Sequence, residues 1–249
     1  MIQNKSLNKD ALTNKMGIQY LNRILRTYAP DGIKQISLYS LKFKTIAVDT
    51  SIYLYRYQAE NCLIENIYLM ISLFKYYKIT PIFVFDGKPP PEKQELLEKR
   101  KIQKEKSKLK CLELEEKLKE NIHDQDKINE IQEEIDREKK KCVKVSKSDV
   151  AEVKELMKAY GVQFIEAEGE ADQLCAKLVQ KKIAYGCLSE DMDLFVYGTS
   201  RVFRYFSLIN SNLVVYNLKT ILQQLNLNLK EFKQICVLSG TDYNNSSDV

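Results

Sequence analysis

Four apolar segments of this chain each run directly into acidic residues. They read KTIAVDTS, TPIFVFDGKPPP, VQFIEAEGEAD and AYGCLSEDMD. Near-continuous apolar runs without alternation are typical of strands buried on both faces, which occur in parallel sheets covered by helices. Asp is a poor strand residue and is costly to bury, so the acids mark the points at which the strands end.

Segments with a helical spacing of apolar residues lie between these runs. They are residues 63–78, 149–161 and 170–182, and we expect Asp149 to cap the second helix and Gly161 to stop it. Strands that alternate with helices indicate an α/β protein. The sequence therefore predicts a three-layer α/β/α sandwich with a mainly parallel central sheet.

The acids that follow the strands are expected to meet on one rim of this sheet, because ligands of such sheets bind beyond the carboxyl ends of the strands. One further acid follows an apolar helix predicted over residues 231–239, and Glu190 would lie nearby as an eighth carboxylate. The seven acids expected on the rim are Asp49, Asp86, Glu170, Asp172, Asp191, Asp193 and Asp242.

Each of these acids has an ordinary explanation when it is taken alone. Asp49 reads as a helix cap and Asp86 as a turn residue. Taken together, several like charges on one rim repel each other and raise each other's pKa unless a cation compensates. Mg²⁺ accepts only oxygen ligands and is commonly held by a few carboxylates and substrate phosphates, so a magnesium site is predicted here.

Composition excludes several other classes of protein. The chain of 249 residues has a single histidine, His123, and six cysteines without a C-x-x-C pair. This argues against a zinc site and against a Ser–His triad, and it suits reduced thiols in an intracellular protein. No apolar run approaches the roughly 20 residues of a membrane helix.

Residues 92–147 contain no Gly or Pro and are mostly Lys, Glu, Leu and Ile. Their pattern predicts two helices that fold back at NIHDQD as a hairpin. A solvated coiled-coil spacer is the ordinary interpretation of such a segment. However, residues 93–110 carry eight Lys or Arg against three acids, and they begin shortly after Asp86. Cations beside a carboxylate site fit phosphodiester chemistry, in which two metal ions activate a water and stabilise the leaving oxygen.

Six stretches, in order, resemble the successive motifs of the flap endonuclease family of structure-specific 5′ nucleases. They are MGIQYL, IAVDTSIYLYRY, FVFDGKPPPEKQELLEKR, VKVSKSDVAEVKELMKAYGVQFIEAEGEADQLCA, LSEDMDLFVYG and LSGTDY. The resemblance extends from Met16 to Tyr243 and is specific because the motifs occur together in this order. It implies a PIN-like core, from residues 16–91 and 148–249, and a helical arch over residues 92–147 that a single-stranded 5′ flap threads.

The resemblance also implies roles for individual residues. Asp49, Asp86, Glu170 and Asp172 would serve mainly one metal ion, and Asp191, Asp193 and Asp242 the other. Lys93 and Arg100 occupy the positions of the catalytic arch cations. Tyr55 would stack on a base near the scissile phosphate, with a core tyrosine as the alternative. Lys88, Lys99, Lys101 and Lys104 are the remaining residues expected to contact the substrate backbone.

Three features depart from the family pattern. Asp172 stands where the family usually has Glu, so we expect it to reach its metal through water. Residues 1–15 precede the usual first motif, so we expect either that translation begins later or that this extension points away from the substrate. After LSGTDY the family continues into a Gly-rich helix–hairpin–helix that grips duplex DNA, whereas this chain ends in NNSSDV. We therefore expect either a fragment or a duplex grip that is supplied differently.

The resulting hypothesis is a two-metal, Mg²⁺-dependent 5′ flap endonuclease and 5′→3′ exonuclease of DNA replication or repair, for which Mn²⁺ substitutes. The expected partners are branched or flapped DNA and a sliding clamp bound through a segment absent here. We expect a monomer, without membrane contact, in the nucleus or at sites of DNA replication. The alternatives are a non-catalytic nucleic-acid scaffold and a less selective PIN-like nuclease acting on RNA.

Overall fold

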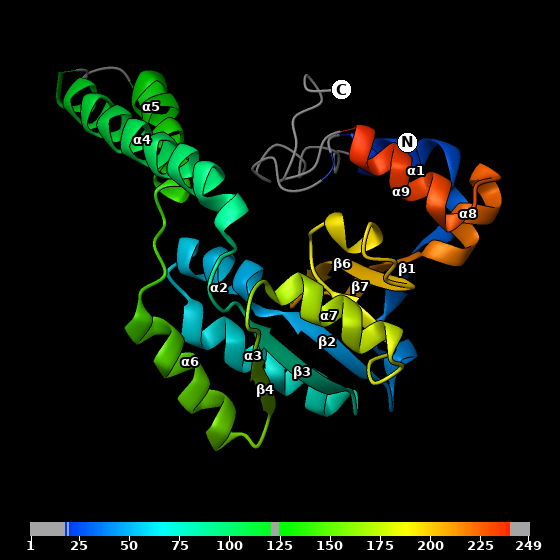
Figure 1. The fold of residues 1–249 in the computed structure, drawn as a ribbon. Coiled ribbons are helices and arrows are strands. Elements are labelled where there is room, and N and C mark those ends of the chain that lie inside the picture. The colour runs from blue at the N-terminus through cyan, green and yellow to red at the C-terminus, as the bar shows by residue number, and fades with distance from the viewer. Residues whose placement is uncertain (1–17, 19, 121–124, 240–249) are drawn as a thin grey trace, which may run out of the picture.

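The computed structural model describes residue 18 and residues 20–120 and 125–239. Its strands form one sheet in the order β1-β7-β6-β5-β2-β3-β4 (Figure 1). The strands are β1 (Ile33–Ser37), β2 (Thr45–Asp49), β3 (Thr80–Phe85), β4 (Gln163–Glu166), β5 (Gly186–Leu188), β6 (Arg201–Ser207) and β7 (Asn212–Asn217). The helices are α1 (Leu21–Tyr28), α2 (Thr50–Ala59), α3 (Leu63–Tyr76), α4 (Gln94–Glu120), α5 (Gln125–Lys141), α6 (Lys147–Ala159), α7 (Ala171–Gln180), α8 (Leu218–Leu225) and α9 (Leu229–Leu238).

The sheet is mainly parallel, as the sequence predicts. β2 is paired in parallel with both β3 and β5, β3 with β4, and β5 with β6. The antiparallel pairs β6–β7 and β1–β7 complete the other side of the sheet. Because β2 lies between β3 and β5, the acids at the ends of these three strands are brought to the same edge.

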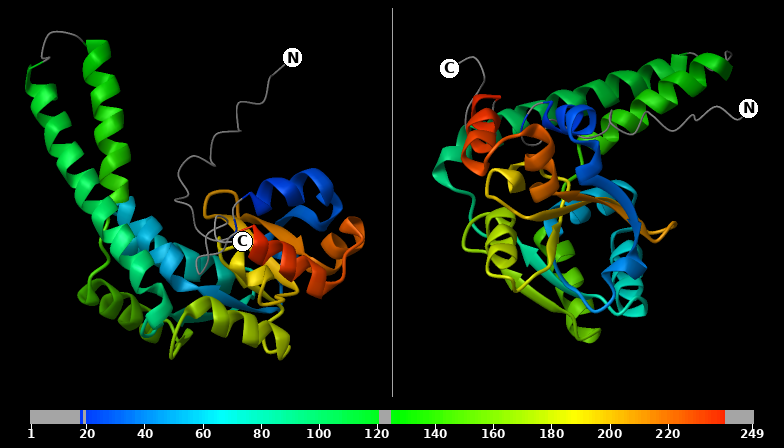
Figure 2. Two further views of the ribbon diagram at one scale, coloured as in Figure 1. Left: turned by 45° about the horizontal axis from the view of Figure 1, so that its top comes forward. Right: turned by 90° about the vertical axis from the view of Figure 1, so that its right-hand side faces the viewer.

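Helices cover both faces of the sheet, which makes the three layers (Figures 1 and 2). Alternate strand residues point to opposite faces. Val48 of β2 belongs to the core cluster that includes residues of α2, α3 and α6, whereas Ala47 belongs to the cluster that includes residues of α1, α7, α8 and α9. Both residues are fully buried, as expected for a central strand without a polar face.

Helices α4 and α5 pack side by side as a hairpin that projects from the sandwich (Figure 2). Its small apolar seam contains Cys111, Leu114 and Ile135, all of which are buried. Ion pairs join the two helices along this seam, such as that between Lys110 and Glu134 at 2.6 Å. Such a narrow apolar seam with charged flanks is typical of an antiparallel helical pair.

The start of α6 differs from our prediction. Ser146, and not Asp149, is the N-cap, and its hydroxyl accepts the backbone N–H of Asp149 at 3.1 Å. The carboxylate of Asp149 in turn accepts the backbone N–H of Ser146 at 2.7 Å. The two residues form a capping box, in which the acid occupies the third helical position.

None of the described helices is both long and apolar enough to cross a membrane. Residues 1–15, the motif start at Met16, and Asp242 lie outside the described residues, as does His123.

Candidate active site

Six predicted acids lie at or just beyond the carboxyl ends of the parallel strands. Asp49 ends β2 and Asp86 follows β3, and the pair Asp191 and Asp193 follows β5. Two more acids belong to α7, which packs against β2, β3 and β5. They are Glu170, the N-cap residue of α7, and Asp172 in its first turn.

The side chain of Asp49 does not cap α2, although the residue occupies the N-cap position. The interpretation of Asp49 as a simple helix cap is therefore wrong. Its Oδ2 instead accepts a 2.8 Å hydrogen bond from the hydroxyl of Ser189. The same hydroxyl accepts the backbone N–H of Asp191 at 3.1 Å. Ser189 thus links the end of β2 to the acidic loop after β5.

Asp86 is more than a turn residue, since its side chain joins two helices. Oδ1 accepts the backbone N–H of Ala171 at 2.8 Å, at the start of α7. Oδ2 accepts the hydroxyl of Ser51, in the first turn of α2, at 2.5 Å. Both bonds are charge-assisted, so they hold the carboxylate in a defined orientation.

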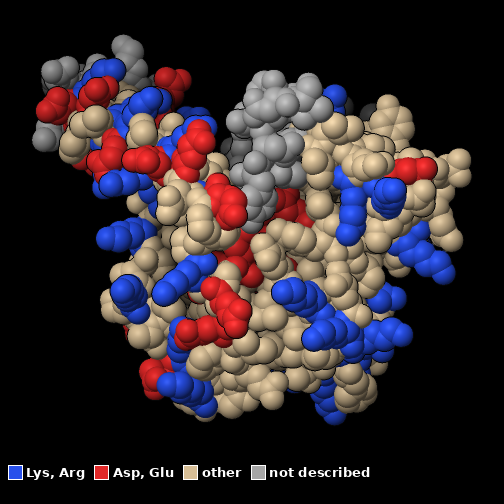
Figure 3. Space-filling view, in the orientation of Figure 1, with Lys and Arg blue, Asp and Glu red and all other residues tan. Residues whose placement is uncertain are grey.

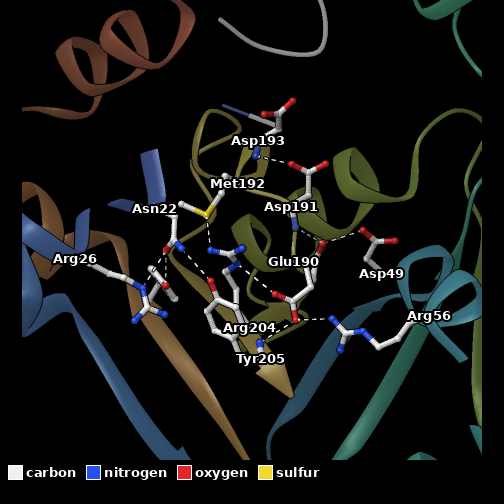
Figure 4. A network of polar contacts seen from close by, with 12 residues as sticks. Asn22, Arg26, Asp49, Arg56, Glu190, Asp191, Met192, Asp193, Arg204 and Tyr205 are labelled. Atoms are coloured by element: carbon white, nitrogen blue, oxygen red, sulfur yellow. Dashed lines mark hydrogen bonds and ion pairs between the residues drawn. The ribbon is translucent and has the colours of Figure 1, made fainter. Parts of the chain in front are cut away.

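The loop after β5 orders its own acids. The backbone N–H of Asp193 donates to Oδ1 of Asp191 at 2.9 Å (Figure 4). Asp193 is buried and begins a 3₁₀ turn that ends at Phe195. The two carboxylates therefore leave the loop in fixed relative positions, with Asp49 beside Asp191 in Figure 4.

The buried acids affect one another electrostatically. Burial raises the pKa of Asp49 well above its ordinary value, and the charges of Asp86, Asp191 and Asp172 raise it further. Burial also raises the pKa of Asp172 to about 7, with Asp191 and then Glu170 as the next causes. Asp49 and Asp172 are therefore poorly solvated and feel the charges of neighbouring acids, whereas Asp86 is exposed.

The donor set of this rim fits a hard divalent cation. Its side chains offer carboxylate oxygens, the ligand type that Mg²⁺ requires, and a cation would relieve the repulsion that raises the two pKa values. In the part of the chain that the structure describes, no three of these groups are yet gathered closely enough to enclose an ion. One carboxylate oxygen of Asp49 accepts a hydrogen bond from Ser189, and the two oxygens of Asp86 accept hydrogen bonds from Ser51 and Ala171. These three oxygens therefore face protein donors.

A predicted arch cation lies directly against these acids. Lys93, in the 3₁₀ turn Pro91–Lys93 before α4, is buried, and its Nζ lies 2.6 Å from Oε1 of Glu170. The other predicted cations lie further along the same segment. Arg100 is partly buried in α4, whereas Lys99 and Lys101 are exposed, and Lys99 pairs with Glu95. Lys88, just after Asp86, is exposed.

Tyr55 is not a core residue, so that alternative is wrong. Its side chain is 47% exposed, whereas its neighbours Tyr53 and Tyr57 are buried in the core between the sheet and the helices on that face. Nζ of Lys104 from α4 lies 5.3 Å from the centre of the Tyr55 ring. Lys104 also donates to the carbonyl of Val143, so it contacts both Tyr55 and the segment that follows α5. An exposed ring beside cations is suited to stacking on a nucleobase.

Glu190 does not point toward the predicted metal site, near which we expected it as an eighth carboxylate. It points the opposite way from Asp191 and Asp193 and meets two arginines (Figure 4). Oε1 lies 3.3 Å from Nη2 of Arg56 and accepts the backbone N–H of Tyr205 at 2.8 Å. Oε2 lies 3.5 Å from Nε of Arg204.

Arg204 was not identified from the sequence, yet it supports the acidic loop from behind. Its guanidinium is buried between the rings of Tyr205 and Tyr216, at 4.8 and 5.5 Å from their centres. Nη1 also lies 3.0 Å from the sulfur of Met192, the residue between the two loop aspartates. The sequence contained one indication of this role. Arg204 lies inside the apolar run RVFRYFS, and an arginine buried in such a run usually has a partner for its charge.

Acidic side chains form a band that runs down the centre-left of the face shown in Figure 3, below the charged hairpin. This surface, built from segments far apart in sequence, can be compared with known proteins. The XPG N-terminal domain model matches residues 16–107, and the XPG I-region model matches residues 161–242.

Relatives named Flap endonuclease 1 are similar to most of the chain. Those of Cryptosporidium muris and Entamoeba histolytica are each 31% identical over 92% of this chain. The relative of Encephalitozoon cuniculi is 32% identical over 92% of this chain. The chain spans 52%, 62% and 68% of the lengths of these three relatives, respectively.

Solved structures have the same fold. The catalytic core of Rad2 in complex with DNA substrate superposes with a TM-score of 0.65 at 27% identity, over 92% of this chain and 63% of that chain. Flap endonuclease-1 from Methanococcus jannaschii gives a TM-score of 0.59 at 24% identity, over 92% of this chain and 71% of that one.

Proposed function

Since the chain belongs to the flap endonuclease family, we propose that it is a nuclease that hydrolyses DNA phosphodiesters at the junction between a 5′ flap and a duplex. The observation that supports this proposal is the position of six carboxylates at the carboxyl edge of the sheet, with Lys93 ion-paired to one of them, Glu170. A polyanionic substrate would place its phosphate between the acids and the basic hairpin. Cleavage would leave a 5′-phosphate and a 3′-hydroxyl.

The acids would hold two Mg²⁺ ions, for which Mn²⁺ would substitute. Asp49, Asp86, Glu170 and Asp172 would serve mainly one ion, and Asp191, Asp193 and Asp242 the other. When bound, such ions supply an activated water and stabilise the leaving oxygen. The chain's own contribution is orientation: Ser189 fixes Asp49, and the N–H of Ala171 fixes Asp86. Outer partners of this kind are nearly as important as the ligands themselves.

The cations would bind and stabilise the reacting phosphate. Lys93 already lies at the acidic rim, where its charge would oppose the negative charge that develops on the phosphate. Arg100, two helical turns along α4, would act with it. Tyr55 would stack on the base next to the scissile phosphate once Lys104 moves from its ring to a backbone phosphate. Lys88, Lys99 and Lys101 would add backbone contacts.

The hairpin of α4 and α5 would form the arch around the single-stranded flap. Lys93 and Arg100 lie at or near its base, so a strand that passes beneath the hairpin would reach these cations and the carboxylates together. We place this activity in DNA replication or repair, in the nucleus, with the chain acting as a monomer and a sliding clamp as a further partner.

The test is cleavage of three labelled substrates in Mg²⁺ and in EDTA: a 5′-flap duplex, a nicked duplex and a single strand. We expect cleavage only with Mg²⁺, fastest on the flap. Absence of metal-dependent cleavage on all three would support the non-catalytic scaffold instead. Equal rates on all three would remove flap selectivity, and faster cleavage of an RNA version would favour an RNA nuclease.

A further inference from the structure

The opposite edge of the sheet, at the amino ends of β2, β3 and β5, has the reverse charge. The loops that meet there belong to the stretches 33–48, 66–85, 173–189 and 194–230, and none of these stretches contains Asp or Glu. Backbone hydrogen bonds hold their loops together. Phe43 donates to the carbonyl of Lys78 at 2.8 Å, and Tyr185 donates to that of Thr45 at 2.7 Å. The acids that follow β2, β3 and β5 lie at the carboxyl edge, whereas basic residues flank the amino ends of these strands.

Cations and aromatic rings alternate on this surface. Nζ of Lys42 lies 4.9 Å and Nζ of Lys78 lies 5.8 Å from the centre of the Phe43 ring. On Tyr185, the guanidinium of Arg201 lies 4.2 Å from the ring centre. We call Lys42, Phe43, Lys44, Lys78, Tyr185 and Arg201 the amino-edge patch. Figure 3 shows Lys and Arg gathered at the lower right, away from the acidic band.

The backbone at Phe43 supports a role for its ring outside the core. Phe43 has φ of 62°, a left-handed conformation that bulky residues rarely adopt. Its side chain is nevertheless 72% exposed, so core packing does not account for a phenylalanine here. A strained, exposed aromatic residue that the surrounding backbone holds in place is a reason to consider binding.

The amino-edge patch also borders a hollow that is lined by cations. A hollow of about 580 Å³ lies between Phe43 and Tyr185, with Lys44, Lys182 and Arg201 on its walls. Among the described residues, no carboxylate is ion-paired with any of these three cations. The cations are therefore available to an external anion.

We propose that the amino-edge patch is a second nucleic-acid site, which binds a single strand away from the catalytic rim. Bases would stack on Phe43 and Tyr185, and the phosphates between them would contact Lys42, Lys44, Lys78 and Arg201. An acidic protein segment would use the cations but would gain little from two exposed rings, so the pairing of rings with cations favours a strand. A strand held at this edge lies across the sheet from the carboxylates and is not cut.

The test measures binding of a fluorescein-labelled dT12 oligonucleotide to the whole chain by anisotropy. EDTA prevents cleavage, and saturating unlabelled flap duplex fills the catalytic face. We expect Phe43→Gly to weaken this binding about tenfold, because one stacking platform is lost. Glycine adopts positive φ without strain, so this variant keeps the fold. Lys44→Ala with Arg201→Ala should reduce the slope of log K against log salt by about 1.4, for two lost phosphate contacts.

Matched controls are Tyr28→Ala, an exposed ring on α1, and Lys158→Ala, an exposed cation on α6, both of which should bind dT12 as the unaltered chain does. Unchanged binding and salt slope in the patch variants would overturn the proposal. So would tighter binding of a poly-glutamate peptide than of dT12, which would indicate an acidic protein partner. Flap cleavage by Phe43→Gly is a separate readout and should be unaffected, so failure here is distinct from failure of the proposed nuclease activity.

Discussion

The hydroxyl of Ser189 donates a hydrogen bond to Oδ2 of Asp49 across 2.8 Å, although 140 residues separate the two in sequence. Ser189 follows β5 and Asp49 ends β2, and these strands are neighbours in the sheet. Because Ser189 also accepts the N–H of Asp191, one fully buried hydroxyl sets the spacing between the two groups of acids. The site thus depends on a residue that would bind neither metal nor substrate.

Ser189→Ala should therefore impair cleavage without removing any proposed ligand. We expect a loss of about 10- to 100-fold in cleavage rate or in apparent Mg²⁺ affinity, as for other residues that orient metal ligands. Mg²⁺ titration of flap cleavage measures both. Thr199→Val is the matched control, since the Thr199 hydroxyl is equally buried and has no hydrogen-bond partner among the described residues. An equal effect of the two substitutions would contradict the role of Ser189.

Lys93→Ala should slow chemistry far more than it weakens binding. The ammonium lies 2.6 Å from Glu170, at the point where a reacting phosphate would sit. We expect the single-turnover rate to fall about a hundredfold or more, because one stabilising cation is lost in a poorly solvated site. The Kd for flap DNA in EDTA should change only a few-fold. Lys108→Ala, which removes an exposed cation of the same helix, is the control. If weaker DNA binding, measured as a higher Kd, accounted for the whole loss of cleavage rate, Lys93 would have no catalytic role.

Arg204→Met should destabilise the fold and disturb the acidic loop. It would leave Glu190 buried with one of its two arginine partners, and breaking a buried pair typically costs about 3 kcal/mol or more. Urea unfolding measures this loss. Lys154→Ala breaks an ion pair in which Glu166 is exposed and should cost less than about 1 kcal/mol. The double variant Arg204→Met/Glu190→Gln should recover part of the stability, and additive losses would exclude their coupling.

Stability without metal should fall as the pH rises from about 4 to about 7. The pKa of Asp172 is raised from 3.8 to about 7 in the folded chain, and that of Asp49 is raised in the same direction. Folded chains then bind more protons than unfolded ones in this window, so deprotonation favours unfolding. Asp172→Asn should remove part of the pH dependence. The measurement is Tm in EDTA at pH 4.5 and 7.5, for the chain and for the variant.

Mg²⁺ should raise the Tm at pH 7.5 in proportion to its occupancy, because it binds the folded carboxylates. An Asp172→Asn variant with the same pH dependence as the unaltered chain would contradict the assignment of this shift to Asp172.

The sequence was sufficient to predict the acidic edge. The runs before Asp49, Asp86 and Asp191 lack polar alternation, so their burial in a parallel sheet and the position of their ends could be inferred. The hairpin β6–β7 and strand β1 were not predicted, although β6 and β7 span seven and six residues. No acid ends these strands, Arg204 interrupts the apolar run of β6, and the pairing is irregular between Arg204 and Ser207.

The supporting contacts could not be predicted, for a different reason. Arg56 and Glu190 are 134 positions apart, and no local pattern indicates that they meet. Glu190 lies within the acidic run and was therefore grouped with the site, although its side chain turns toward the arginines. Tyr55 was ambiguous because Tyr53 and Tyr57 on the same helix are buried, and only the packing of α2 shows which of the three rings faces outward.

The most direct test of the central claim is single-turnover cleavage of a labelled 5′-flap duplex by the chain and by Asp191→Asn in saturating Mg²⁺. The substitution keeps size and removes one negative charge from the proposed metal site. We predict that cleavage falls about a thousandfold or more, while the Kd for the same duplex in EDTA stays within about threefold. A variant that cuts at the normal rate would contradict the assignment of this carboxylate edge as the catalytic centre.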